Sequence, residues 1–157
     1  MNQPQFVITH VSSMQPGRLA IQFADGWAGE VDLSHVIEKH PTLQRLKQPE
    51  VVSNVTVDEW SRGVMFAGDD DLTLASDNLR ALAIEQAGDF SHQQLIGWMH
   101  HHDLSLETAA QALGISRRML AYYRSGERPI PRTVGLAMLG WEAMESGHHL
   151  NEYGCVA

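Results

Sequence analysis

The chain has 157 residues, of which 43% are hydrophobic and 19% are charged, a composition that is typical of globular proteins and excludes a disordered chain. It carries 11 Lys and Arg against 19 Asp and Glu, a formal net charge of -8, so any contact with nucleic acid must come from a local basic patch. The single cysteine, Cys155, excludes an internal disulfide framework and a cysteine-based structural zinc site. The sequence also lacks an apolar run near the roughly 18 residues of a membrane span, and its N-terminus lacks the pattern of a secretion signal. We therefore expect a soluble, cytoplasmic protein.

Short strand-like segments make up the first half of the chain, beginning with a predicted strand over residues 6–11. The clearest signal is a β-hairpin over residues 18–33. Apolar and other residues alternate along its first arm, Asp25-Gly26 suits a tight turn, and the returning arm places Trp27, Gly29, Val31 and Leu33 on one face. The segments that follow are a short helix over 35–40 capped by Ser34, a helical piece with Leu43 and Leu46, strands over 51–57 and 64–66, a turn over 68–71, an extension over 72–74 and a helix over 79–86.

From Phe90 onward the strand signals vanish, and apolar residues recur at helical spacing. We expect helices after Ser91, over 105–113, from Ser116, and over about 132–146 behind Pro131. The predicted fold class is α+β, with a small antiparallel-sheet domain over 1–88 for interaction or dimerisation, an all-α domain over 89–147 and a flexible tail over 148–157.

The most informative pattern lies in residues 105–131, where two short helices flank a turn. A small residue allows the helices to cross closely, a glycine ends the first helix in the left-handed conformation, and a serine caps the second helix. The residues that carry this pattern are Ala110, Gly114, Ile115, Ser116, Leu120 and Tyr123. Their spacing is typical of a helix-turn-helix.

Residues 91–146 resemble the lambda-repressor/Cro-like DNA-binding domains, whose five-helix core presents its third helix to the DNA major groove. The matching positions are Ala110, Gly114, Ile115, Ser116, Leu120, Gly126 and the proline-containing segment after it. The resemblance implies sequence-specific DNA binding through helix 116–125. Two departures stand out: Arg124 occupies a position where the family usually has Glu, and the fifth helix is missing or merged into a long fourth helix.

The first half carries a second resemblance, in the stretches LAIQFADGWAGEVDL, HPTLQRL and GDDDLTLASDNL. Most of residues 6–80 is similar to a small uncharacterised bacterial α+β domain. That domain occurs alone, often beside toxin-like partners, or fused to a helix-turn-helix. It has no known catalytic residues, so the resemblance implies a fold and a context rather than a chemistry.

Charge is distributed unevenly along the chain. Residues 1–90 carry 6 basic and 13 acidic side chains, whereas residues 105–132 carry five arginines against two glutamates. Arg117 and Arg118, in the first turn of the predicted recognition helix, are expected to reach base edges, because arginine can bind guanine O6 and N7 together. The predicted DNA-binding residues are Ser105, Ser116, Arg117, Arg118, Met119, Ala121, Tyr122, Arg128 and Arg132.

Other clusters favour structural roles. Three consecutive histidines, 100–102, cannot converge on one metal ion from a regular helix, and their place at a helix C-terminus explains them. Asp69–Asp71 lacks the pattern of a calcium loop. No nucleophile motif is present, so we expect neither enzyme activity nor a cofactor or metal. The tryptophans, expected in the core, are Trp27, Trp60, Trp98 and Trp141.

The sequence therefore favours a bacterial transcriptional regulator that binds double-stranded DNA as a homodimer. Two surfaces for the dimer stay open, the N-terminal sheet and the helix that holds Leu136, Leu139 and Trp141. The alternative is a protein-binding module, such as an antitoxin-like factor that neutralises a partner, with or without DNA-dependent autoregulation.

Overall fold

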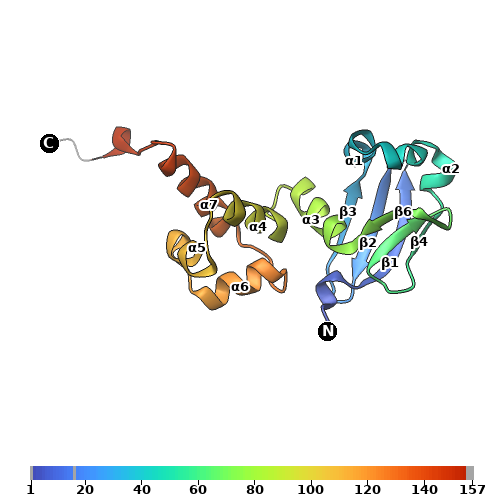
Figure 1. Cartoon of the computed structure of the whole chain (residues 1–157), viewed down its shortest axis with the longest axis horizontal. Helices are drawn as coiled ribbons and strands as arrows, with labels where there is room; N and C mark the ends of the chain where they lie inside the picture. Colours follow the sequence, from blue (N-terminus) through green and yellow to red (C-terminus); the bar gives the residue numbers. More distant parts are fainter. Residues whose placement is uncertain (1, 16, 155–157) are drawn as a thin grey trace. The chain divides into compact units, whose positions relative to one another are not determined.

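The computed structural model describes residues 2–15 and 17–154 (Figure 1). The chain divides into two compact units, residues 1–88 and residues 89–157. Cys155 and the last two residues of the predicted tail lie outside the described residues. None of the described helices has the length and the apolar character that crossing a membrane requires.

The first unit contains two three-stranded antiparallel sheets, so the predicted α+β class is confirmed. One sheet has the order β1-β2-β3 and the other the order β4-β5-β6. The strands are β1 (Ile8–Gln15), β2 (Arg18–Phe23), β3 (Ala28–Asp32), β4 (Val55–Val57), β5 (Gly63–Phe66) and β6 (Asp69–Ala75). The helices are the 3-10 helices η1 (Pro4–Phe6) and η2 (Pro41–Lys47) and the α-helices α1 (Ser34–Lys39), α2 (Pro49–Val52) and α3 (Ser76–Gln86). Helix α3 packs against β3 (Figure 1).

The hairpin of β2 and β3 follows from its sequence as predicted. Leu19 pairs with Val31 across the two strands, and both side chains are fully buried. At the turn, Gly26 has φ +92°, and the Trp27 amide donates to the Asp25 carboxylate at 3.1 Å. Alternation therefore buries one face of the hairpin in the core of the unit, while the turn residues fix its register.

Three strand and turn predictions in this unit are wrong. The first strand begins at Ile8 rather than Phe6, because Pro4 starts a 3-10 turn ahead of it. Residues 51–52 belong to α2, which Pro49 opens, so only 55–57 of the predicted strand is extended. The turn before β6 is made by Ala67 and Gly68, both with positive φ, whereas Asp69–Asp71 already belongs to the strand.

Three further details differ from the prediction. Ser34 is the first residue of α1 rather than its cap, and its amide and hydroxyl both donate to the Asp32 carboxylate. Trp60 is 76% exposed on the loop between β4 and β5, not in the core. The predicted tail contains a 3-10 turn, η3 (Asn151–Tyr153).

The second unit contains four α-helices in its described part, α4 (His92–His101), α5 (Leu106–Leu113), α6 (Arg117–Ser125) and α7 (Arg132–Glu145). Helix α6 packs against both α4 and α5, and α5 packs against α7. Their buried apolar residues form a core of their own, made of Leu95, Trp98, Met99, Ala109, Ala110, Leu120, Tyr123, Ile130, Val134 and Met138. This core fixes the position of α6 within the unit.

Candidate nucleic-acid interface

Helices α5 and α6 are joined by a tight turn. Gly114 ends α5 with φ +69°, and the Ile115 amide donates a hydrogen bond to the Ala110 carbonyl at 3.1 Å. The Ser116 hydroxyl then accepts from the Met119 amide at 3.1 Å and caps α6. Because the left-handed residue and the cap lie within three consecutive residues, α6 begins directly after the turn that ends α5.

Helix α6 has one buried side and one exposed side. Leu120 and Tyr123 are buried, at 0% and 6% exposed. Arg117, Arg118 and Ala121 are exposed. The helix therefore anchors its apolar side in the core and presents arginines to solvent.

Four residues on and after α6 form a contact group, which we call the α6 cluster: Arg118, Met119, Tyr122 and Arg128. The Arg118 guanidinium donates to the Tyr122 hydroxyl, from Nη2 at 3.3 Å and from Nε at 3.4 Å. The Arg128 guanidinium carbon lies 4.4 Å from the centre of the Tyr122 ring, and Arg128 Nη1 lies 3.7 Å from the Met119 sulfur. Tyr122 thus holds two arginines at once, one through its hydroxyl and one through its ring.

The path of the chain after α6 brings Arg128 to this position. Gly126 ends α6 with φ +78°, and the Arg128 amide donates to the Tyr122 carbonyl at 3.3 Å. The hydrogen bond with Tyr122 raises the pKa of Arg118, with a smaller electrostatic contribution from the same side chain.

The remaining predicted residues are placed differently. Met119 is half-buried against the core rather than on the outer side of α6. The Ser105 and Ser116 hydroxyls are already engaged as caps, Ser105 by the Thr108 amide at 3.1 Å. The first-turn amides, which have no acceptor within their helix, are thus the groups at these N-termini that an anion could use.

Arg132 is exposed at the first position of α7. Among the described residues, Ser105 and Arg132 form no hydrogen bond, ring contact or ion pair with the α6 cluster. The predicted set omits Arg124, a further exposed arginine in the last turn of α6. The arginine-rich composition of residues 117–132 is the signal that could have found it.

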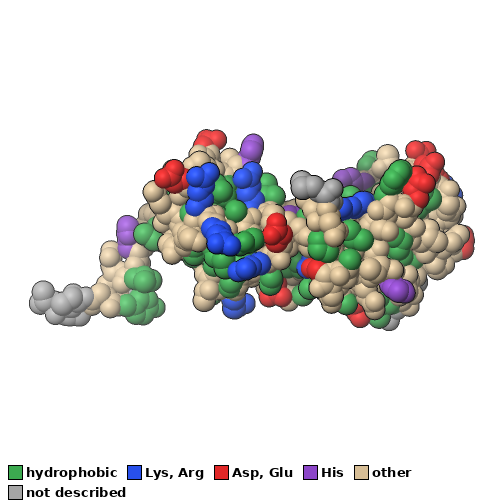
Figure 2. Space-filling model, turned by 90° about the horizontal axis from the view of Figure 1, so that it is seen from below, with side chains coloured by type: hydrophobic (Ala, Val, Ile, Leu, Met, Phe, Trp, Pro, Cys, Tyr) green, Lys and Arg blue, Asp and Glu red, His purple; other side chains and the backbone are tan. Residues whose placement is uncertain are grey.

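The arginines of this unit are not neutralised by neighbouring carboxylates. Among the described residues, they form no ion pair, whereas Arg18, Arg45 and Arg80 of the first unit each pair with a carboxylate. Figure 2 views the helical unit from the side on which α6 lies in Figure 1, and basic side chains gather there with fewer acidic ones between them. Such a local excess of unpaired cations attracts a polyanion despite the negative charge of the whole chain.

The histidine run at the end of α4 has a packing role. His102 Nε2 lies 2.9 Å from Glu142 Oε1 on α7, and its ring contacts those of Trp98 and Trp141 edge-on. In the part of the chain that the structure describes, no three His, Cys, Asp or Glu side chains are grouped as a metal site would need.

Comparison with solved structures places the chain among known proteins. A crystal structure from Nitrosomonas europaea ATCC 19718, named "Putative DNA Binding Protein NE0471", is 42% identical, and the match covers 94% of each chain with a TM-score of 0.80. The chain belongs to the family of that protein. Residues 11–84 also match the family "Protein of unknown function (DUF2442)", and this match lies within the first unit of the chain. Among curated proteins, none matches the sequence.

Proposed function

We propose that the protein is a bacterial transcriptional regulator whose second unit binds double-stranded DNA through α6. The observation that carries the proposal is a capped, exposed, arginine-bearing helix that a left-handed turn sets against the helix before it. This arrangement supports the proposal because it resembles the helix-turn-helix of lambda-repressor-like domains, which lay the second helix of the pair in the major groove. The name of the Nitrosomonas relative is consistent with this assignment.

In this proposal the role of each residue follows from its position on the helices. Arg117 and Arg118 lie in the first turn of α6, where repressor-type helices contact base edges. Tyr122 holds both Arg118 and Arg128. Tyr122 and Arg128 reach the groove wall or a phosphate, while Arg132 and the first-turn amides of α5 and α6 contact the backbone. The mechanism is occlusion or recruitment at a promoter, with no covalent chemistry and no cofactor.

The negative charge of the first unit opposes the attraction between DNA and the arginines of the second unit. Residues 1–88 carry 12 acidic and 6 basic side chains, so this unit repels DNA while the arginines of the second unit attract it. Affinity should therefore fall steeply with salt. In a plot of the logarithm of the binding constant against the logarithm of the salt concentration, each phosphate contacted should contribute a slope of roughly -0.9. We propose that the protein acts as a cytoplasmic homodimer on half-sites about one helical turn apart.

The test is fluorescence anisotropy with DNA selected by the protein from a random-sequence pool, with a scrambled duplex as reference. Replacing Arg117→Ala and Arg118→Ala together should weaken binding to the selected duplex by at least about tenfold, since each good base contact contributes roughly 1–3 kcal/mol. Binding to the scrambled duplex should change much less.

A matched control removes the same charge from the first unit. Lys39→Ala with Lys47→Ala replaces two exposed lysines and should leave specific binding almost unchanged. If the two double variants lose affinity equally, the effect is one of net charge and α6 is not the reading helix. If the selection enriches no sequence, the proposal of a sequence-specific regulator fails, and a helix pair that serves protein contacts becomes the better account.

A further inference from the structure

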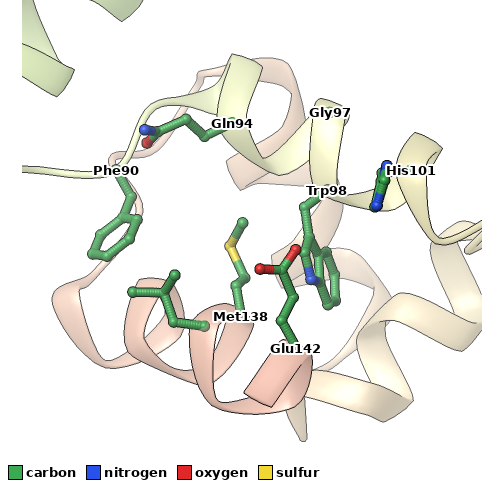
Figure 3. Close-up of a pocket in the computed structure, with 8 residues that line it drawn as sticks. Phe90, Gln94, Gly97, Trp98, His101, Met138 and Glu142 are labelled. Atoms are coloured by element: carbon green, nitrogen blue, oxygen red, sulfur yellow. The ribbon is translucent and has the colours of Figure 1, made fainter. Parts of the chain in front are cut away.

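A pocket of about 290 Å³ opens in the second unit, between α4, α7 and Phe90 (Figure 3). It is lined by Phe90, Gln94, Gly97, Trp98, His101, Met138, Leu139 and Glu142. For comparison, an engineered apolar cavity of about 150 Å³ is enough to bind benzene. The pocket therefore has room for one aromatic ring with substituents, and it contains none of the residues proposed to contact DNA.

The indole N–H of Trp98, which lines the pocket, has no hydrogen-bond acceptor among the described residues. Its side chain is 6% exposed, and its indole nitrogen is the buried side-chain polar atom that has no hydrogen-bond partner among the described residues. In Figure 3 the nitrogen lies on the edge of the ring nearest the Glu142 side chain. A buried donor without an acceptor is costly to a fold. An acceptor that entered the pocket would remove that cost.

Glu142 restricts what this acceptor can be. Its carboxylate repels an anion, and it offers acceptors rather than donors. Its Oε1 lies 2.9 Å from His102 Nε2, but the side chain is 43% exposed, so a ligand that displaces this one contact can reach the indole N–H. A hydroxyl meets both groups, because it accepts from the indole and donates to the carboxylate. The apolar part of such a ligand would lie against Phe90 and Met138.

We propose that this pocket binds a small, uncharged aromatic molecule with a hydroxyl group, such as a phenol. The proposal concerns the protein without DNA and does not depend on the function proposed above. Gly97 provides the sharpest probe, because a Cβ built there meets no atom within 4 Å although the residue lines the pocket. A side chain at this position has room at the wall of the pocket and need not displace the core.

The test titrates the full-length, 15N-labelled protein with 4-methylphenol, with toluene and with 4-methylbenzoate. The indole N–H signal of Trp98 is assigned by its loss in Trp98→Phe. We expect 4-methylphenol to shift this signal and to bind about tenfold more tightly than toluene, as one added hydrogen bond implies. The anion 4-methylbenzoate should not bind.

Two glycine variants separate the pocket from other sites. Gly97→Leu should abolish the shift, whereas Gly140→Leu, on α7 and also in open space, should retain it. Leucine favours a helix over glycine at both positions, so both variants should fold. Equal affinity for phenol and toluene, unchanged binding by Gly97→Leu, or no shift of the Trp98 signal up to the solubility limit would each overturn the proposal.

Discussion

Two glycines of helix α7 lie in opposite surroundings, which makes the same substitution a test of the packing of the second unit. A Cβ at Gly135 would lie 2.0 Å from one ring carbon of Phe90 and 2.3 Å from two more. A Cβ at Gly140 would meet nothing within 4 Å. Alanine should therefore be tolerated at position 140 and should destabilise the packing at position 135.

The magnitudes follow from two terms. Replacing a helical glycine by alanine stabilises a helix by up to about 1 kcal/mol, and this gain is common to both variants. At Gly135→Ala the ring must also move by about 1 Å or more, and such overpacking costs about 1–3 kcal/mol. We expect Gly140→Ala to be the more stable variant by about 1–3 kcal/mol. In a unit of this size the difference corresponds to about 4–24 °C in Tm.

The assay must report on the second unit alone. Replacing Trp27 and Trp60 by Phe leaves Trp98 and Trp141, both in the second unit, as the fluorescent reporters. Thermal and urea unfolding of the two alanine variants would then be compared in this background. If Gly135→Ala were as stable as Gly140→Ala, Phe90 would not pack on α7 as described, and the wall of the pocket would have to be redrawn.

Further changes test the core, the turn between α5 and α6, and the Asp32 carboxylate. Leu120→Ala should destabilise the second unit by about 2–5 kcal/mol in urea unfolding, because the side chain is fully buried; a loss below about 1 kcal/mol would contradict its place in the core. Gly114→Ala should cost about 1–2 kcal/mol despite the open space around it, because its φ of +69° is unfavourable for alanine; a variant as stable as the wild type would argue against the left-handed turn. Hydrogen bonds from the Ser34 hydroxyl and amide lower the pKa of Asp32. The carboxylate therefore adds stability above the ordinary aspartate pKa of about 4 and loses it as pH falls through the lowered pKa. The stability difference between wild type and Asp32→Asn should shrink over that fall in pH.

The sequence predicts best those elements in which several local signals agree. The hairpin of β2 and β3 combines alternation with a turn dipeptide, and α5 and α6 combine apolar spacing with serine caps. The prediction over 51–57 fails because buried valines suit a short buried helix as well as a strand, and Pro49 decides between them. Each error in the first unit falls at a boundary or in a short segment, where tertiary contacts override local preference.

The candidate interface could be predicted only as a set of residue types. Spacing within α6 separates its buried side from its exposed side. The meeting of Arg128 with Tyr122 depends on the return of the chain after Gly126, which no periodicity in the sequence encodes. The exposure of Trp60 is of the same kind, since apolar character alone does not say whether a loop residue is covered.

The α6 cluster makes three positions depend on one another. Arg118 and Arg128 are long side chains that lose freedom when they bind, and Tyr122 restrains both in the free protein. A replacement of the tyrosine would release both arginines together. A change at any one of the three positions therefore alters how much the other two contribute to binding. Within the family, positions 118, 122 and 128 should therefore vary as a group, and relatives that lack the tyrosine should also have exchanged the arginines around it.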